Sequence, residues 1–241
     1  MKRSLAVIAI TSLCFFSHSA LAAPEAVQLK DKKDKISYSL GADIGKSIKI
    51  QKIELNPEAF MAGIREGQAE KFTSLSEDEI KQTLMALQTE MLEKQKEEMK
   101  KLAAKNKTEG EKFLADNKKQ KGIVTLPDGL QYRIIKKGSG ETPKSTDTVV
   151  THYRGKLVNG TEFDSSYTRG EPAKFVVNGV IPGWTEALQL MTPGSKWELF
   201  VPAKLAYGEH AVGGKIGPNS TLIFEVELLS IEKPNETANK S

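Results

Sequence analysis

The sequence has few residues that could ligate a metal or act as a thiol nucleophile. Its 241 residues include one cysteine, Cys14, and three histidines. Cys14 lies in an N-terminal segment that we expect to be absent from the mature protein, so we expect no disulfide and no cysteine-based site. His152 and His210 alone are too few for a histidine-based metal site or a Ser-His-Asp triad. We therefore expect chemistry that uses no metal and no cofactor.

Long hydrophobic runs are also scarce, and the clearest one lies near the N-terminus. Residues Leu5–Phe16 are mostly apolar, but this run is too short for a transmembrane helix. Lys2 and Arg3 precede the run and Ala20-Leu21-Ala22 follows it, which is the order of a positive region, an apolar region and a cleavage site. The pattern predicts a signal peptide over residues 1–23 and export across the inner membrane.

A lipoprotein signal, with the lipid on Cys14, is the alternative interpretation of this segment. Bulky Leu13 stands directly before Cys14, where such a signal has a small residue, and this disfavours the alternative. No other segment is apolar enough to predict a membrane span. The 35 basic and 31 acidic residues are mixed along the chain and give a net charge of +4. This charge is too small and too evenly spread to predict a nucleic-acid partner.

Proline is absent between Pro57 and Pro127, and this stretch carries helix signals. Residues 24–35, before it, are polar and expected to be loose. Asn56 can cap a helix that has Pro57 in its first turn. Ser76-Glu77-Asp78-Glu79 has the spacing of a capping box and predicts the start of a longer helix.

This longer helix has an apolar stripe only near its start, made by Ile80, Leu84, Leu87 and Met91. A stripe of this kind would be a sticky patch on a small monomeric region, so we predict a homodimer built by residues 36–92. The segment from Glu93 to Lys112 is polar and expected to be solvated. It continues either as one rod, roughly 60 Å long at 1.5 Å per residue, or as shorter helices broken near Asn106 and Gly110; we favour the rod.

From Gly122 onward, short segments of alternating apolar and polar residues replace the helical pattern. One helical stretch, Thr185–Leu190, follows Pro182-Gly183-Trp184. The expected strands are Leu130–Lys136, Thr148–Leu157, Lys174–Val177, Lys196–Val201 and Thr221–Ile231. The pattern predicts an α+β domain in which an antiparallel sheet wraps over a short helix. The expected layout is a helical dimerisation region over 24–75, a connecting helix over 76–120, the α+β domain over 121–232 and a disordered tail over 233–241.

Ordered motifs in residues 125–232 resemble those of the FKBP-type peptidyl-prolyl cis–trans isomerases. They are Val150-Thr151-His152-Tyr153-Arg154-Gly155, Gly160-Thr161-Glu162-Phe163-Asp164-Ser165-Ser166, Val180-Ile181-Pro182-Gly183-Trp184, Leu205-Ala206-Tyr207-Gly208, Gly217-Pro218-Asn219 and Thr221-Leu222-Ile223-Phe224-Glu225-Val226-Glu227-Leu228. The resemblance implies the FKBP fold and an enzyme that accelerates rotation about X-Pro bonds in exported proteins. The partners it implies are proline-containing polypeptides and macrolide inhibitors such as tacrolimus and rapamycin.

Motifs in the N-terminal half resemble one branch of this family, the macrophage infectivity potentiators (Mip). They are Asp34-Lys35-Ile36-Ser37-Tyr38-Ser39-Leu40-Gly41, Asn56-Pro57-Glu58-Ala59 and Leu126-Pro127-Asp128-Gly129-Leu130-Gln131-Tyr132. Members of the branch are homodimers whose N-terminal regions intertwine and whose long helices carry the catalytic domains apart. The resemblance thus implies a homodimer that is periplasmic or associated with the outer membrane or surface of a Gram-negative bacterium, with a role in virulence.

The resemblance also implies which residues form the proline pocket. Asp164, Trp184 and Tyr207 would be catalytic, and the substrate-binding residues would be Tyr153, Phe163, Phe175, Val180, Ile181, Ile216 and Phe224. Trp184 would form the floor, the Ile181 amide and the Tyr207 hydroxyl would bind carbonyls of the ligand, and Asp164 would pair with Arg169 at the rim.

The flap and rim depart from the pattern of eukaryotic members. Ala173 stands where many of those members have an aromatic residue, and Val212 and Lys215 also differ from them. These departures predict a more open rim, and they make macrolide binding a weaker expectation than isomerase activity.

A second class of protein fits some of these residues. Phe175, Val180 and Phe224 would look the same in an ordinary β core, and Asp164-Ser165-Ser166 can be read as a turn. The alternative is therefore a non-catalytic dimeric chaperone, or a module that only holds proline-rich segments. The ordered set of motifs favours the enzyme.

Overall fold

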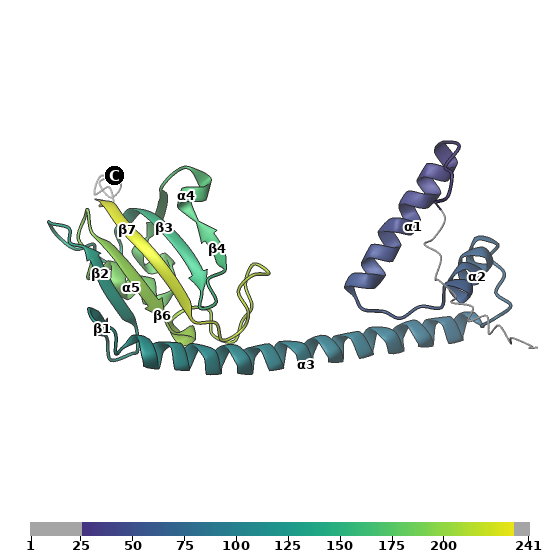
Figure 1. Cartoon of the computed structure of the whole chain (residues 1–241), viewed down its shortest axis with the longest axis horizontal. Coiled ribbons are helices and arrows are strands. Elements are labelled where there is room, and N and C mark those ends of the chain that lie inside the picture. Colours follow the sequence, from purple (N-terminus) through teal and green to yellow (C-terminus); the bar gives the residue numbers. More distant parts are fainter. Residues whose placement is uncertain (1–25, 234–241) are drawn as a thin grey trace, which may run out of the picture. The chain divides into compact units, whose positions relative to one another are not determined.

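The computed structural model describes residues 26–233, and the chain divides between Ser76 and Glu77 into two compact units. The expected signal peptide and almost all of the expected C-terminal tail lie outside the described residues. No helix within residues 26–233 is both long and apolar enough to cross a membrane. Figure 1 labels most of the helices and strands along the chain.

The first unit contains helices α1 (Lys32–Ile50) and α2 (Pro57–Gln68). The side chain of Asp31 accepts a hydrogen bond of 2.8 Å from the Asp34 amide and caps the start of α1. The expectation of a loose segment up to residue 35 is therefore wrong for its last residues. Asn56 caps α2, as expected, because its side chain accepts hydrogen bonds from the next helical amides. Neither helix has a buried residue.

The second unit begins with α3 (Glu77–Asn117), a continuous helix of 41 residues. The interpretation as a rod requires this continuity, and the alternative of helices broken near Asn106 and Gly110 is wrong. Both residues lie against the sheet domain: Asn106 is half-buried and Gly110 is buried. The expectation that the whole segment from Glu93 to Lys112 is solvated is therefore also wrong at these two positions, because the domain covers them.

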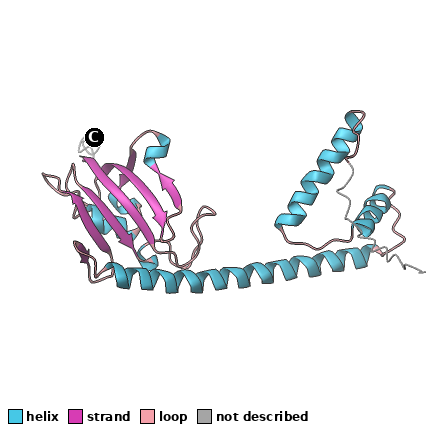
Figure 2. Ribbon diagram, viewed as in Figure 1, coloured by secondary structure: helices cyan, strands magenta, loops and turns pink. Residues whose placement is uncertain are grey.

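The rest of the second unit is one seven-stranded antiparallel sheet in the order β1-β2-β6-β7-β3-β4, with β5 pairing with β3. Figure 2 shows the strands side by side as a twisted sheet. The strands are β1 (Ile123–Thr125), β2 (Gln131–Lys136), β3 (Thr148–Leu157), β4 (Glu162–Ser165), β5 (Ala173–Val176), β6 (Lys196–Val201) and β7 (Leu222–Glu232). The helices among them are α4 (Ser166–Arg169), α5 (Pro182–Leu188) and the 3-10 turns η1 (Val177–Gly179) and η2 (Ala203–Leu205). The predicted α+β fold is thus confirmed.

One face of the sheet packs its apolar side chains around α5. Alternation along the central strands places every second residue on this face, as a period of two requires. The fully buried strand residues on this face include Val149, Leu199, Leu222, Val226 and Leu228, and Leu188 of α5 is fully buried with them. This core fixes α5, and with it Trp184, against the middle of the sheet.

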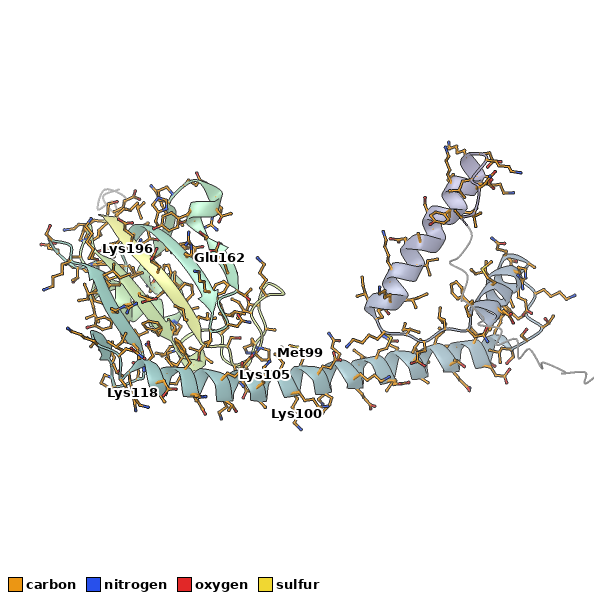
Figure 3. The ribbon with its side chains drawn as sticks, viewed as in Figure 1. Met99, Lys100, Lys105, Lys118, Glu162 and Lys196 are labelled. Carbon is orange, nitrogen blue, oxygen red and sulfur yellow. The ribbon has the colours of Figure 1, made fainter. Side chains whose placement is uncertain are left out.

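The opposite face of the sheet is charged in its middle and covered by α3 at one end. Lys196 pairs with Glu225 at 2.8 Å and Arg154 pairs with Glu162 at 3.1 Å, and Figure 3 labels Lys196 and Glu162. Near its C-terminal end α3 contributes Phe113, whose ring centroid lies 5.9 Å from that of Phe200. This cover explains why Phe200 is buried although it points away from the main core.

The sequence predicted two strands with their observed bounds, Thr148–Leu157 and Lys196–Val201. It missed β1, β4 and α4, which have three or four residues each. Segments of this length are too short to show a hydrophobic period. Only their pairing with neighbouring strands defines β1 and β4.

Candidate active site

Trp184 forms the centre of an aromatic cluster on the core side of the sheet. Pro182 lies in the first turn of α5, where proline's missing amide hydrogen costs nothing, and Trp184 follows it on the buried side of this turn. Its ring lies 5.3 Å from that of Tyr153, 5.7 Å from that of Phe175 and 5.2 Å from that of Phe224. The three interplanar angles lie between 82° and 89°, the edge-to-face geometry that aromatic rings favour.

Gly155 gives this cluster its width. Gly155 on β3 lies opposite Phe224 on β7. Because Gly155 has no side chain, the space beside it is open to the neighbouring aromatic rings. A Cβ atom there would lie 2.6 Å from the Phe163 ring and 2.9 Å from the Phe224 ring. These two rings instead meet edge to face, with centroids 5.6 Å apart. A glycine at this strand position thus lets β4 bring Phe163 into the same cluster.

Asp164 lies at the polar edge of the cluster, two residues before the end of the motif that carries it. Its carboxylate accepts hydrogen bonds from the Tyr153 hydroxyl and from the Arg169 guanidinium. Arg169 also donates to the Tyr153 oxygen at 2.9 Å, and its guanidinium carbon lies 5.4 Å from the centre of the Tyr153 ring. The three side chains therefore form a closed triangle, in which the pairing of Asp164 with Arg169 agrees with expectation and the bonds to Tyr153 were not foreseen.

The electrostatics of this triangle favour an ionised Asp164. Partial burial acts to raise the pKa of Asp164, but the hydrogen bonds from Tyr153 and Arg169 outweigh it and hold that pKa below its usual value. Burial and the hydrogen bond to Asp164 raise the pKa of Tyr153. At neutral pH the tyrosine is therefore a donor and the aspartate an acceptor.

The remaining predicted pocket residues come from the loops around α5 and before β7. Val180, Ile181 and Tyr207 are half-buried and pack against the core, whereas Ile216 is buried within it. Val212 and Ile216 exchange backbone hydrogen bonds of 2.9 and 3.1 Å and form a small hairpin. The fold thus gathers nine of the ten predicted site residues in or against one core cluster. The tenth, Asp164, lies at the polar edge of this cluster.

Ser166 is a supporting residue that sequence reasoning missed. Its hydroxyl accepts a hydrogen bond of 2.8 Å from the Tyr153 amide and lies 3.0 Å from Nδ1 of His152. Tyr167 stacks on His152, with ring centroids 4.7 Å apart. These contacts tie α4 to β3 and so hold Arg169 near the rim. No pattern in the sequence relates His152 to α4, because they meet only when β3 pairs with β4.

The arrangement offers an aromatic surface of largely buried side chains with one ionised carboxylate at its edge. Within residues 26–233 no group of three or more histidine, cysteine, aspartate or glutamate side chains could hold a metal ion. Ligand sites in proteins are commonly lined by apolar and aromatic side chains, with a few polar groups that orient the ligand. The geometry suits binding and distortion of a peptide more than attack by a nucleophile.

Two family models match the chain. One, described as "FKBP-type peptidyl-prolyl cis-trans isomerase", matches residues 139–229, and the other, described as "Domain amino terminal to FKBP-type peptidyl-prolyl isomerase", matches residues 33–134. Together they match most of both described units of the chain.

Relatives and a solved structure agree with these models. The "Outer membrane protein MIP" of Legionella longbeachae is 48% identical over 97% of this chain and 99% of that protein. The "Peptidyl-prolyl cis-trans isomerase Mip" of Coxiella burnetii is 44% identical over 86% of this chain and 90% of that protein. The crystal structure of FkpA from Escherichia coli matches with a TM-score of 0.70 and 43% identity, over 86% of this chain and 99% of that one. The chain therefore belongs to the FKBP-type peptidyl-prolyl cis–trans isomerases and resembles the Mip proteins over most of its length.

Proposed function

We propose that the aromatic cluster around Trp184 is the substrate site, and that the proline ring of an X-Pro segment lies on the Trp184 ring. The observation that carries the proposal is the arrangement of Tyr153, Phe175 and Phe224, whose rings stand nearly perpendicular to that of Trp184. They form walls around a flat apolar floor. A saturated five-membered ring is the part of a peptide that matches this shape and polarity.

The chemistry follows from the electronic structure of the amide bond. Resonance makes a planar peptide bond resist rotation by about 18–20 kcal/mol, and X-Pro bonds exchange between isomers in tens to hundreds of seconds. The twisted amide at the top of this barrier has lost resonance and is less polar than the planar one. A site with little water and low polarity therefore destabilises the planar amide relative to the twisted amide and lowers the barrier.

The polar groups at the edge have separate roles in this proposal. The Ile181 amide and the Tyr207 hydroxyl donate to carbonyl oxygens on either side of the rotating bond, and so hold the rest of the peptide still. Asp164 orients Tyr153 and Arg169 at the rim. A hydrogen-bond donor held in this way is placed in advance for the twisted geometry of the amide. None of these steps requires a nucleophile or a covalent intermediate.

A refolding assay limited by proline isomerisation tests the proposal against the binding-module alternative. We expect acceleration at protein concentrations far below that of the refolding substrate, and loss of several-fold in kcat/KM on Tyr207→Phe with unchanged near-UV circular dichroism. Acceleration only at stoichiometric concentration would support a module that holds proline segments. An unchanged kcat/KM in Tyr207→Phe would remove the hydroxyl from the mechanism.

We further propose that residues 36–92 form a homodimer, because this part of the chain leaves large apolar side chains exposed. Leu40 is 62% exposed, Tyr38 60% and Leu84 60%. Each of these side chains lies on a helix, where a large apolar side chain is expected to be buried against a core. The two helices before Ser76 have no buried residue. A second copy of the same region is the partner that offers matching apolar surface in equal amount.

This assembly favours a second function beside isomerisation. Two sites carried on one dimer raise the local concentration for a second contact with the same unfolded chain, which suits a chaperone. Sedimentation equilibrium of residues 24–241 measures the assembly directly. We expect a dimer at micromolar concentration, and a monomer would contradict the proposal.

We propose export and a periplasmic or outer-membrane location, which rest on the predicted signal peptide and on similarity to a protein named for the outer membrane. Fractionation of cells, with N-terminal sequencing of the mature chain, tests the location and the cleavage near Ala23.

Macrolide binding is proposed for the aromatic pocket around Trp184. Titration of the protein's tryptophan fluorescence, which comes from Trp184 and Trp197, with tacrolimus or rapamycin tests it, and weak binding is the result expected from an open rim at Ala173.

A further inference from the structure

The loop between β6 and β7 forms one wall of the proposed site. It carries Tyr207 and then a flap, which we define as residues 208–217, with Ile216 buried in the core cluster. Two backbone bonds between Val212 and Ile216 hold the tip of the flap together. The Asn219 amide donates to the Gly208 carbonyl at 2.7 Å and closes the flap at its base. The position of Ile216 therefore depends on what holds this base.

The base of the flap rests on α3. The side-chain amide of Asn106 donates to the Pro218 carbonyl at 2.8 Å and lies 3.4 Å from the Ser220 hydroxyl. Ser220 in turn donates to the Gly217 carbonyl at 2.8 Å. Figure 3 labels Met99 and Lys105 on the stretch of α3 beside this loop. A helix that lies far from the flap in sequence thus supplies a direct hydrogen bond to the residues that close it.

Two glycines allow the helix and the loop to approach this closely. A Cβ atom on Gly217 would lie 2.9 Å from Nδ2 of Asn106 and 3.0 Å from Leu102. A Cβ atom on Gly110 would lie 2.3 Å from the Thr221 hydroxyl oxygen. Contacts this short leave no room for a side chain at either glycine. Gly110 belongs to the helix and Gly217 to the loop. The contact is therefore a fitted one along two turns of α3.

We propose that Leu102, Asn106 and Gly110 position the flap for catalysis, so that this part of α3 belongs to the machinery of the active site and does more than connect two regions. The inference rests on the proposed site around Trp184. Asn106 is the central positioning residue, because it alone of the three forms a hydrogen bond with the loop. It touches neither the substrate nor the reacting bond.

The chain offers a matched control for Asn106. Asn117 is the same residue type on the same helix, and its side-chain amide also donates to the sheet domain, to the Gln131 side chain at 2.9 Å. Gln131 lies on β2, next to the edge of the sheet that is opposite to β3 and β4. Asn106→Ala and Asn117→Ala thus each remove side-chain hydrogen bonds between α3 and the domain, but only the first removes bonds to the base of the flap.

Both variants are to be made in the mature chain and examined by amide hydrogen exchange and by isomerase kinetics on a short proline peptide. In Asn106→Ala we expect exchange at the Val212, Ile216 and Asn219 amides to become about fivefold faster, the effect of one lost hydrogen bond. We expect kcat/KM to fall by a similar factor. Asn117→Ala should leave both quantities unchanged.

Equal changes in the two variants would overturn the proposal, because they would show a general loss of stability. Faster exchange at the flap with an unchanged kcat/KM would also overturn it, because the flap would then move without consequence for catalysis. If the unmodified protein had no isomerase activity, the proposed function would fail instead. The exchange measurements would then still decide whether Asn106 holds the flap.

Discussion

Asp164 accepts hydrogen bonds from both of its neighbours at the rim of the site, Tyr153 and Arg169. Its bonds to Tyr153 and Arg169 fix a ring that also forms a wall beside Trp184. Because these bonds hold the pKa of Asp164 below its usual value, its carboxylate should remain ionised through the range in which a free aspartate takes up a proton. The stabilisation that it provides is present at neutral pH and is lost only as the pH falls through this lowered pKa.

Asp164→Ala is expected to reduce kcat/KM about tenfold while the domain stays folded, because Tyr153 and Arg169 lose their common anchor. Glu162→Ala is the matched control: it removes a carboxylate two residues away, on β4, whose partner Arg154 lies on the opposite face of the sheet. Kinetics on a proline peptide, with near-UV circular dichroism for folding, measure the effect. Loss of activity in both variants, or loss in step with the circular dichroism, would show that Asp164 has only a structural role.

Asp128 and Glu186 form a carboxyl pair between the turn before β2 and α5. Burial and the hydrogen bond with Asp128 raise the pKa of Glu186 to about 7 from its ordinary value of 4.5. The folded protein therefore keeps a proton that the unfolded chain releases, so folding takes up a proton between these two pH values. Stability should fall as the pH rises through this window and stay lower above it. Lys204 is the positive group that acts on Asp128 from η2.

Glu186→Gln is expected to raise the free energy of unfolding by about 1 kcal/mol at pH 8 and to change it little at pH 4, where Glu186 of the wild type carries its proton. The amide keeps a donor for Asp128 and removes the charge that repels it. Urea unfolding at the two pH values gives both numbers. Glu171→Gln, at an exposed carboxylate, should change neither of them, and a variant less stable than the wild type at pH 8 would contradict the account.

The C-terminal turns of α3 pack on the sheet domain, and this changes which fragment can be studied alone. A fragment of residues 122–241 would contain every strand of the sheet but would lack α3. Without α3 it would expose Phe200 and leave Gln131 without the Leu114 carbonyl and the Asn117 amide. A fragment that begins near Met99 keeps these contacts and is the better test of an isolated catalytic unit.

Gly110→Ala is expected to destabilise the protein by about 1–3 kcal/mol, because the new methyl group overlaps the buried Thr221 side chain. In an open helix the same change would stabilise by about 1 kcal/mol through helix propensity. Thr108→Ala, at an exposed position of α3, is the control for propensity alone. Thermal unfolding of both variants measures the difference, and a Gly110→Ala protein as stable as the wild type would mean that α3 can move away at no cost.

The assembled molecule is expected to differ from its catalytic unit in its action on large substrates. Leu84→Glu places a charge on the exposed apolar face near the start of α3 and should dissociate the proposed dimer. Gln82→Glu adds the same charge two residues away, on the opposite side of the helix, and should leave the dimer intact.

For this pair of variants, kcat/KM on a short peptide should be unchanged, whereas catalysis of the refolding of a large protein should fall only in Leu84→Glu. The physical reason is the loss of a second linked site. Sedimentation equilibrium identifies the assembly in each sample. A monomeric Leu84→Glu that refolds a large protein as well as the wild type does would separate chaperone action from dimerisation.

Local signals in the sequence determined much of this protein. Caps at Asn56 and Ser76, alternation in β3 and β7, and ordered motifs from Tyr153 to Phe224 were sufficient to predict α2, α3 and the main strands and to assign candidate pocket residues, but they predicted neither α1 nor α4. These signals are readable because caps and hydrophobic periods depend on residues a few positions apart. The same signals could not predict β1 and β4, whose existence depends on pairing.

Only the tertiary structure decided how distant segments meet. The hydrogen bond that Tyr153 donates to Asp164, the one that it accepts from Arg169, and the contact of Asn106 with Pro218 join residues that no local pattern relates. Polar residues such as Asn106 and small ones such as Gly110 look like solvated or helix-breaking positions in a sequence. Asn106 becomes half-buried and Gly110 buried because the sheet domain presents a surface that matches them, and such a surface exists only after the strands have paired.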